Sequence, residues 1–271
     1  MSAVCKRACM SRANYYAVHR QRQARKVDED LIVALVRAQR QMHPRMGCRK
    51  LLRLLRPKLK EAGVKVGRDR LFAILGAQGL LVEPKRGRPR TTNSRHCLPV
   101  FHNLVAGVQP DGPHQILVSD VTYIWTEEGF LYAALITDMF SRKIVGSYIG
   151  DSLEADGCIQ ALHRAMAQLP ATAHPIHHSD RGCQYCCHAY VDVLLARALP
   201  VSMTEALHCY ENAMAERVNG ILKQEYNLDA KFRTKVQAIA AFNQAVWLYN
   251  HSRPHLALSY RTPAEAHQTA A

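Results

Sequence analysis

The feature that most limits how this chain folds is a stretch between Glu83 and His96 that has no apolar side chain. Its charged and small polar residues, interrupted by glycine and proline, cannot join a hydrophobic core, and this composition is typical of a linker. The whole chain is 48% apolar, which is enough for a core on each side of the linker. We therefore predict a first domain over residues 1–82, a basic linker over 83–97 and a second domain over 98–271.

The two sides of this linker differ in charge. Residues 1–100 contain 24 Lys and Arg against 6 Asp and Glu, a net charge of +18, whereas residues 101–271 contain 12 against 16, a net charge of −4. A basic surface that merely faces solvent would be one explanation. Because the excess is confined to about one third of the chain, it favours a first domain that binds nucleic acid.

Composition also limits the location of the protein. The longest apolar runs, such as 31–36, are far shorter than a membrane span, and the basic N-terminus has no apolar segment of a secretory signal. Nine cysteines are an odd number in a chain too long to need disulfides, so we do not expect disulfides. The cluster of Cys183, Cys186, Cys187 and His188 lacks the second spaced pair of ligands typical of a closed zinc site, so we expect its cysteines to be free thiols. We predict a cytoplasmic, nucleoid-associated protein with no membrane partner.

Apolar residues at helical spacing predict three helices in the first domain. The first begins near Asp28 and ends at Pro44, the second follows Gly47 and is broken or kinked at Pro57, and the third starts at about Arg68. The last two, joined by a turn that contains glycine, have the layout of a helix-turn-helix. An ordinary three-helix bundle with a basic outer face has the same pattern, and the charge favours DNA binding.

Two groups of arginines are candidate DNA-binding residues in this half. A recognition helix directs its first residues toward base edges, which indicates Arg68 and Arg70. The linker run Arg86-Gly87-Arg88-Pro89-Arg90 resembles an AT-hook, which places arginine in the narrow minor groove of A·T-rich DNA. The three arginines of this run, Arg86, Arg88 and Arg90, are explained equally well by a basic linker that only improves solubility.

The second domain has the pattern of a mixed sheet. β-branched and aromatic runs predict a hairpin and a third sequential strand, and the rest alternates helices with strands. The predicted strands are 115–125, 130–136, 143–149, 175–179 and 200–204, and the predicted helices are 154–169, 189–198, 212–226 and 236–249. This order predicts an α/β fold in which helices flank both faces of the sheet.

Three carboxylates of this domain lie where such a sheet would bring them together. Asp120 is embedded in an apolar strand, Asp180 directly follows the strand that ends at Ser179, and Glu216 belongs to a helix. On a helical wheel the polar residues of that helix share one face, opposite an apolar face that we expect to pack on the sheet, and we expect the polar face to be presented to a cleft. The polar residues are Asn212, Glu216, Asn219 and Lys223, and the apolar ones are Met214, Val218 and Ile221.

Three such carboxylates can hold two Mg²⁺ or Mn²⁺ ions, because hard cations prefer oxygen ligands. Two metals at one site are typical of phosphodiester chemistry, in which no nucleophilic side chain is required. Asp138 is also on a strand, but it precedes the turn at Ser141 and Arg142, and we interpret it as a structural hydrogen-bond acceptor.

The set of motifs in residues 27–267 resembles the DDE insertion-sequence transposases, of the type whose second reading frame encodes a core similar to retroviral integrases. The matching runs are 119–124, 137–146, 178–185, 211–216 with 222–225, and 249–255 with 262–265. The resemblance implies an RNase H-like fold preceded by the small all-α domain. It also implies that Asp120, Asp180 and Glu216 are the catalytic, metal-binding triad of a polynucleotidyl transferase.

The resemblance further implies the reaction, which is cleavage at the ends of the element followed by attack of the freed 3′-hydroxyl on another DNA. Lys223, two helical turns after Glu216, corresponds to a lysine that touches the terminal DNA, and Arg181 and Asn212 are further candidate DNA-binding residues. Expected partners are terminal-repeat and target DNA, other copies of the chain assembled on DNA, and the upstream-frame protein of the same element.

Two alternatives remain open from the sequence. A non-catalytic DNA-binding regulator, or a decayed transposase, would keep the basic first domain without needing all three carboxylates. A hydrolytic nuclease of the same fold would differ only in using water where a transposase uses a 3′-hydroxyl. Reaction products separate these alternatives.

Overall fold

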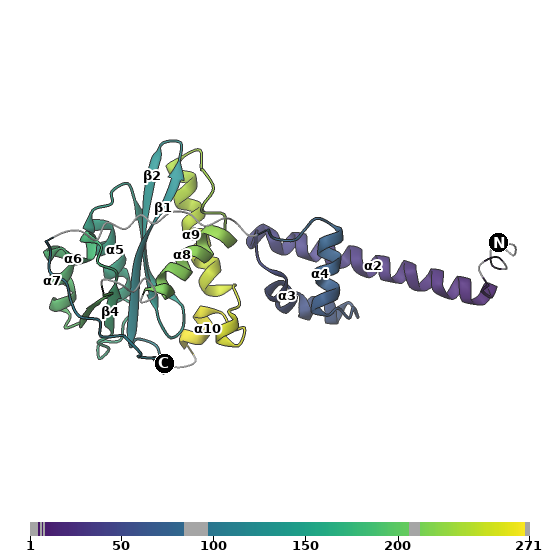
Figure 1. The fold of residues 1–271 in the computed structure, drawn as a ribbon, viewed down its shortest axis with the longest axis horizontal. Coiled ribbons are helices and arrows are strands. Elements are labelled where there is room, and N and C mark those ends of the chain that lie inside the picture. The colour runs from purple at the N-terminus through teal and green to yellow at the C-terminus, as the bar shows by residue number, and fades with distance from the viewer. Residues whose placement is uncertain (1–4, 6, 8, 84–96, 206–211, 269–271) are drawn as a thin grey trace. The chain divides into compact units, whose positions relative to one another are not determined.

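The computed structural model describes residues 5, 7, 9–83, 97–205 and 212–268 of the 271-residue chain. The chain divides after Glu83 into two compact units, the first helical and the second built on a sheet (Figure 1). The AT-hook-like arginines Arg86, Arg88 and Arg90 lie outside the described residues. Within the described ranges, no helix combines the length and the apolar character needed to cross a membrane.

The first unit contains three helices around one small core. They are α2 (Arg12–Met42), α3 (Cys48–Glu61) and α4 (Arg68–Ala77). Leucine and isoleucine side chains at helical spacing bury one face of each helix against the other two. The fully buried residues include Ile32, Val36, Leu51, Leu55, Leu71 and Leu75.

The first helix starts earlier than expected, and the second is not broken at Pro57, where a break or a kink was expected. The first helix begins at Arg12 rather than near Asp28, because Ser11 caps it by accepting the Asn14 N–H at 3.1 Å and no glycine or proline interrupts the segment that follows. The second helix continues through Pro57, since Leu55 before it and Leu59 after it both stay in the core. Apolar packing therefore outweighs the hydrogen bond that proline removes.

The second unit contains a five-stranded sheet with the order β3-β2-β1-β4-β5. The strands are β1 (Ile116–Thr126), β2 (Gly129–Asp138), β3 (Ile144–Gly150), β4 (Ile176–Ser179) and β5 (Val201–Met203). β1 pairs with β2 and β2 with β3 in antiparallel fashion, whereas β4 is parallel to both β1 and β5. β1 is therefore the central strand.

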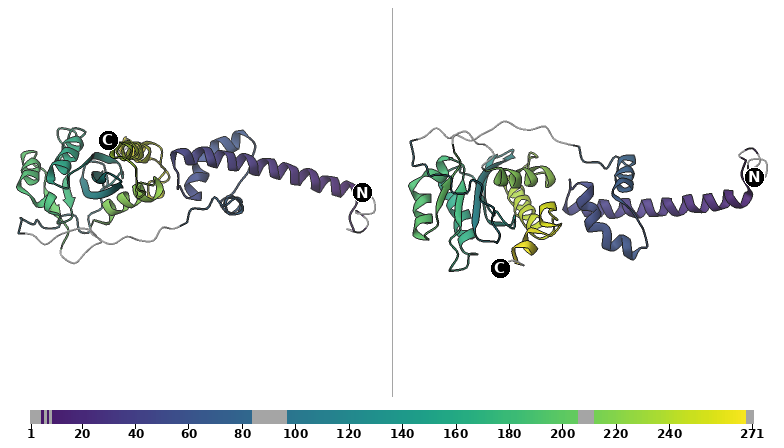
Figure 2. Two further views of the ribbon diagram at one scale, coloured as in Figure 1. Left: turned by 90° about the horizontal axis from the view of Figure 1, so that it is seen from above. Right: turned by 60° about the horizontal axis from the view of Figure 1, so that its bottom comes forward.

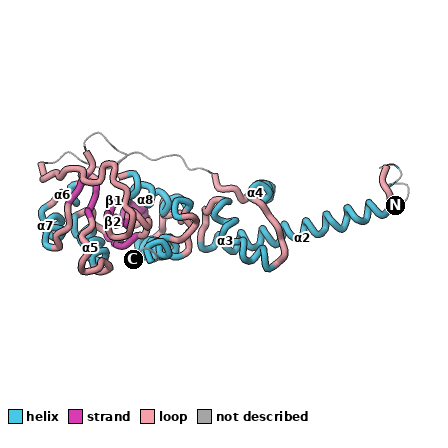
Figure 3. The backbone as a smooth tube through the Cα atoms, turned by 90° about the horizontal axis from the view of Figure 1, so that it is seen from below, coloured by secondary structure: helices cyan, strands magenta, loops and turns pink. Residues whose placement is uncertain are grey.

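Helices cover both faces of this sheet, as Figures 2 and 3 show. One face packs against α5 (Ala155–Met166), α6 (Cys183–Cys186) and α7 (His188–Ala196), and the other packs against α8 (Ala213–Glu225) and α9 (Lys235–His251). The 3₁₀ turn η1 (Leu256–Leu258) and α10 (Pro263–Gln268) follow α9. The predicted order of strands and longer helices is confirmed, whereas α6, η1 and α10 are too short to produce a recognisable period.

Candidate active site

Asp120 lies on the face of the sheet that carries α8. Side chains alternate along β1, so Val118, Asp120 and Ile124 share a face, and the two apolar ones pack into the cores that α8 helps to form. In the parallel pairing of β1 with β4, Ser119 is opposite Ser179. The next residues, Asp120 and Asp180, therefore follow at equivalent positions of neighbouring strands.

Glu216 approaches the same place from the first turn of α8. Its side chain is exposed, whereas Asp120 and Asp180 are partly buried. Partial burial and the charge of Asp180 raise the pKa of Asp120 from the ordinary 3.8 to about 7. The charge of Glu216 makes a smaller contribution in the same direction. Asp180 and Glu216 are thus close enough for their charges to act on Asp120.

Hydrogen bonds hold two of these carboxylates in place. The backbone N–H of Val121 donates to Asp120 Oδ1 at 2.9 Å, and Asn219 Nδ2 donates to Asp120 Oδ2 at 2.7 Å. Both bonds favour the ionised form and lower the pKa of Asp120, so burial and repulsion dominate the final value. The backbone N–H of Gly182 donates to Asp180 Oδ1 at 3.0 Å.

Two asparagines of α8 contact β1 on either side of Glu216. Asn212, the N-cap of α8, donates from Nδ2 to the Ser119 carbonyl at 3.0 Å, and Asn219 donates to Asp120. Both are buried, and within the described part of the chain neither Oδ1 has a hydrogen-bond partner. The polar side of α8 was expected to face a cleft, and Asn219 on that side donates its amide to the Asp120 carboxylate.

The donor set of this site suits a divalent cation. Carboxylate oxygens from three elements are the ligands that Mg²⁺ prefers, and a cation would offset the repulsion that raises the pKa of Asp120. In the described residues, however, no three Asp, Glu, His or Cys side chains close into a compact metal-binding group.

A buried polar network lies beside the site and was not found from the sequence. His177 Nε2 on β4 is 2.7 Å from Ser119 Oγ on β1 and 2.8 Å from the hydroxyl of Tyr190 on α7. Burial holds the pKa of His177 near 3, so the ring is neutral at physiological pH. These bonds tie β1 to β4 immediately before Asp120 and Asp180, which fixes the register on which both carboxylates depend.

Asp138 has the structural role that the sequence predicted. It is fully buried, and its two oxygens accept hydrogen bonds from the backbone N–H groups of His114 and Ser141 and from the Ser141 hydroxyl, at 2.7–2.8 Å. Three donors account for this carboxylate without any role in catalysis.

The other predicted site residues have varied surroundings. Lys223 is partly exposed in the last turn of α8, and Arg181 donates from Nε to the Thr204 carbonyl at 2.6 Å. In the first unit, Arg68 pairs with Asp69 at 2.7 Å, and Arg70 lies 3.8 Å from Glu29. Contact of these side chains with DNA, like that of the buried Asn212, stays a prediction.

Comparison with known proteins gives two family matches, both described as an integrase core domain, over residues 110–209 and 198–263. The chain is 34% identical to an uncharacterized 31 kDa protein of insertion element IS600 from Shigella sonnei, over 99% of this chain and 100% of that protein. It is 36% identical to the transposase for insertion sequence element IS629 from Shigella sonnei, over 83% of this chain and 74% of that protein.

A structural likeness supports the fold. The cryoEM structure of a simian T-cell lymphotropic virus intasome in complex with the PP2A regulatory subunit B56 gamma matches with a TM-score of 0.50 and 18% identity, over 82% of this chain and 70% of that one. The predicted RNase H-like core, preceded by a helical domain, is confirmed. The chain therefore belongs to the insertion-sequence transposases that contain an integrase core domain.

Proposed function

We propose that this transposase cleaves DNA at the ends of an insertion sequence and transfers the freed 3′ ends to a second DNA, with Asp120, Asp180 and Glu216 as its metal-binding triad. The observation that carries the proposal is the placement of Asp120 on β1, Asp180 directly after the neighbouring β4 and Glu216 in the first turn of α8, where the charges of the last two help to raise the pKa of Asp120. Such a concentration of negative charge is costly for folding and suits the binding of divalent cations.

Each part of the surrounding structure orients one carboxylate. Val121 and Asn219 hold Asp120 by its two oxygens, and the Gly182 N–H holds Asp180. Asn212 fixes the start of α8 on β1, which keeps Glu216 above the strand. The three carboxylates would hold two divalent ions, which would supply activation of the attacking water or 3′-hydroxyl and stabilisation of the leaving oxygen in an in-line displacement.

DNA is the proposed partner of both units. The reaction acts on both ends of one element, which calls for more than one copy of the chain. The basic first domain supplies contacts to phosphates, and we propose that Lys223, two turns after Glu216 on α8, and Arg181, next to Asp180, contact the terminal DNA. Assembly with the upstream-frame protein of the same element is part of the same proposal.

The test compares reaction products on labelled terminal-repeat DNA with Mg²⁺ or Mn²⁺. The wild type should yield cleaved and joined products, and Asp120→Asn or Glu216→Gln should abolish both while DNA affinity stays within about twofold, because the basic domain is unchanged. Asp192→Asn, which removes the same charge from an exposed position on α7, is the matched control and should keep its activity.

Other products would change the conclusion. Cleavage without joining would favour a hydrolytic nuclease, and binding without either reaction would favour a non-catalytic regulator. If Asp120→Asn and Glu216→Gln reacted as fast as Asp192→Asn, the triad assignment would be wrong.

A further inference from the structure

The first half of α2 extends beyond the core of its own domain (Figure 1). Of the 31 residues of α2, only Ile32 and Val36 are buried, and the core of the unit starts at Leu31. Residues 12–27, here called the α2 arm, are all exposed except Tyr15 and Val18, which are partly buried. At about 1.5 Å per residue the arm is about 24 Å long, comparable to seven base pairs of duplex DNA.

The α2 arm has a single sign of charge. It contains five cations, Arg12, Arg20, Arg22, Arg25 and Lys26, together with His19, and no carboxylate. Among the described residues, none of the five cations takes part in an ion pair or hydrogen bond through its side chain. The arm is therefore a stretch of uncompensated positive charge.

The spacing of these cations works against the helix when nothing is bound. Arg22 is three residues before Arg25 and four before Lys26, so like charges lie next to each other on the helix surface. A solvent-exposed helix of this length is only marginally stable by itself in water. A polyanion lying along the arm would remove the repulsion and stabilise the helix at the same time.

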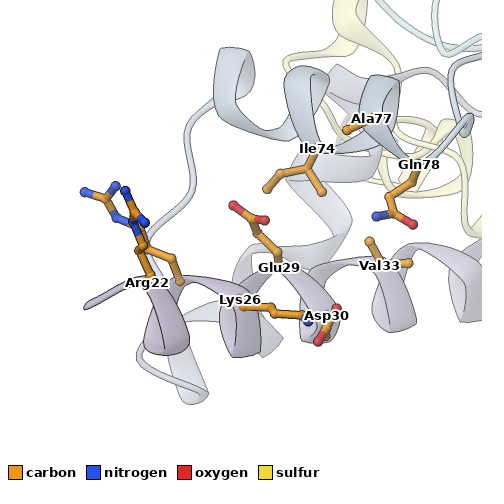
Figure 4. A pocket seen from close by; sticks show the side chains of 9 residues that line it. Arg22, Lys26, Glu29, Asp30, Val33, Ile74, Ala77 and Gln78 are labelled. Atoms are coloured by element: carbon orange, nitrogen blue, oxygen red, sulfur yellow. The ribbon is translucent and has the colours of Figure 1, made fainter. Parts of the chain in front are cut away.

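The carboxylates that follow the arm do not neutralise it. A hollow of about 360 Å³ lies between α2 and α4 at the end of the arm, with Arg22, Arg25 and Lys26 in its lining (Figure 4). Glu29 points from α2 toward Ile74 of α4 in this view, and its nearest cation is Arg70 of α4, at 3.8 Å. Glu29 thus pairs with α4, and although Asp30 lies beside Lys26 in the same view, no cation of the arm forms an ion pair among the described residues.

Self-association along the arm is a poorer explanation. The partly buried Tyr15 and Val18 could begin an apolar stripe, but the same spacing continues into Arg22, Arg25 and Glu29. A coiled coil requires apolar residues at these positions over several turns. Two copies of the arm would also bring ten cations together, whereas DNA phosphates are complementary to them.

We propose that the α2 arm binds the phosphates of duplex DNA without regard to base sequence, as an addition to any contacts made by α4. The proposal rests on the proposed function only in taking DNA as the partner. Each cation that neutralises a phosphate releases counterions, so the binding constant should fall steeply with salt. Binding should also increase the helix content of the arm.

The test uses the full chain and a 30-base-pair duplex of random sequence. The variant Arg20→Gln, Arg22→Gln, Arg25→Gln, Lys26→Gln keeps residues of good helix propensity and leaves the core untouched. We expect it to bind about tenfold or more weakly at 0.1 M salt and to reduce the slope of log K against log salt by about 3. The matched control Arg20→Lys, Arg22→Lys, Arg25→Lys keeps every charge and should keep the slope.

The outcomes separate this proposal from the proposed function, because binding is measured without metal and without catalysis. An unchanged affinity and salt slope in the glutamine variant would overturn it. So would a loss confined to terminal-repeat DNA with random DNA unaffected, which would indicate base-specific reading. A glutamine variant that binds DNA normally but no longer forms oligomers would assign the arm to self-association instead.

Discussion

Replacement of Asp120 by asparagine should stabilise the metal-free protein above neutral pH, although it removes the proposed activity. The carboxylate of Asp120 has a pKa of about 7 in the folded protein, against an ordinary value of 3.8, because it is partly buried beside Asp180 and Glu216. Its ionisation therefore opposes folding, and asparagine cannot ionise.

The sign of the effect follows from proton binding. Below about pH 4 the carboxyl group is protonated in both the folded and the unfolded chain. Between about pH 4 and 7 the folded protein keeps a proton that the unfolded chain has released, so the stability of the wild type falls as pH rises, and above about pH 7 the loss is complete. A difference of about 3 in pKa corresponds to about 4 kcal/mol. Because water still reaches Asp120 and screens its charge, we expect about 2 kcal/mol.

The local hydrogen bonds can adapt to this substitution. The asparagine oxygen can accept from the Val121 N–H, as Asp120 Oδ1 does in the wild type. The new amide would face Asn219, whose Oδ1 has no partner in the described part of the structure and can accept after rotation of the side-chain amide. The substitution therefore exchanges one unpartnered atom for another and adds none.

Urea unfolding in EDTA at several pH values from 5 to 8 measures the prediction. At pH 8 the free energy of unfolding of Asp120→Asn should exceed that of the wild type by about 2 kcal/mol, and the difference should shrink toward pH 5. Excess Mg²⁺ should stabilise the wild type more than the variant, because ligand binding to the folded state adds to stability. Identical pH dependence of the wild type and Asp120→Asn would refute the reasoning, and Asp192→Asn controls for the loss of one charge.

Three further results are expected. Asp138→Ala should lower the free energy of unfolding by about 3 kcal/mol in urea titrations, because it leaves three donors without their buried acceptor; a loss under 1 kcal/mol would contradict this role. Gly182→Ala should slow cleavage about 10- to 100-fold with little change in thermal stability. The reason is that the Cβ of the new alanine would lie 3.0 Å from Asp180 Oδ1 and displace that carboxylate. A normal rate of cleavage would show that this displacement does not affect catalysis. Lys223→Ala should weaken binding to terminal-repeat DNA and reduce the salt slope by about 1, and an unchanged slope would exclude a phosphate contact there.

The sequence predicts the parts of the fold that depend on local pattern. The alternation along β1 and the apolar run before Asp180 indicate two strands, and the apolar stripe that includes Val218 indicates a helix that packs on the sheet. The sequence therefore predicts the strand that carries Asp120, the strand that precedes Asp180 and the helix that carries Glu216. It does not predict the burial of Asn219. A helical wheel places Asn219 beside Glu216 on a polar face turned toward a cleft, but the burial of its side chain follows only from the tertiary pairing with Asp120.

The same limit explains the errors in the first unit. The start of α2 at Arg12 depends on a cap and on good helix formers that carry no apolar period, so a search for amphipathic spacing finds only the part that packs. The continuation of α3 through Pro57 depends on leucines whose partners lie on other helices. Local rules give the preference of a segment, and the packing of distant segments decides the outcome.

One strand accounts for the convergence of the site. β1 carries Asp120, its parallel pairing with β4 sets the position of Asp180, and its Ser119 carbonyl accepts the amide of Asn212, which fixes the helix that carries Glu216. The side-chain hydroxyl of Ser119 contacts His177 of β4, so Ser119 links β1 both to α8 and to β4. A shift of β1 by one residue would exchange its two faces and move Asp120 away from α8. The buried network around Ser119 therefore serves the carboxylates by fixing the register of β1, although none of its members needs to contact metal or DNA.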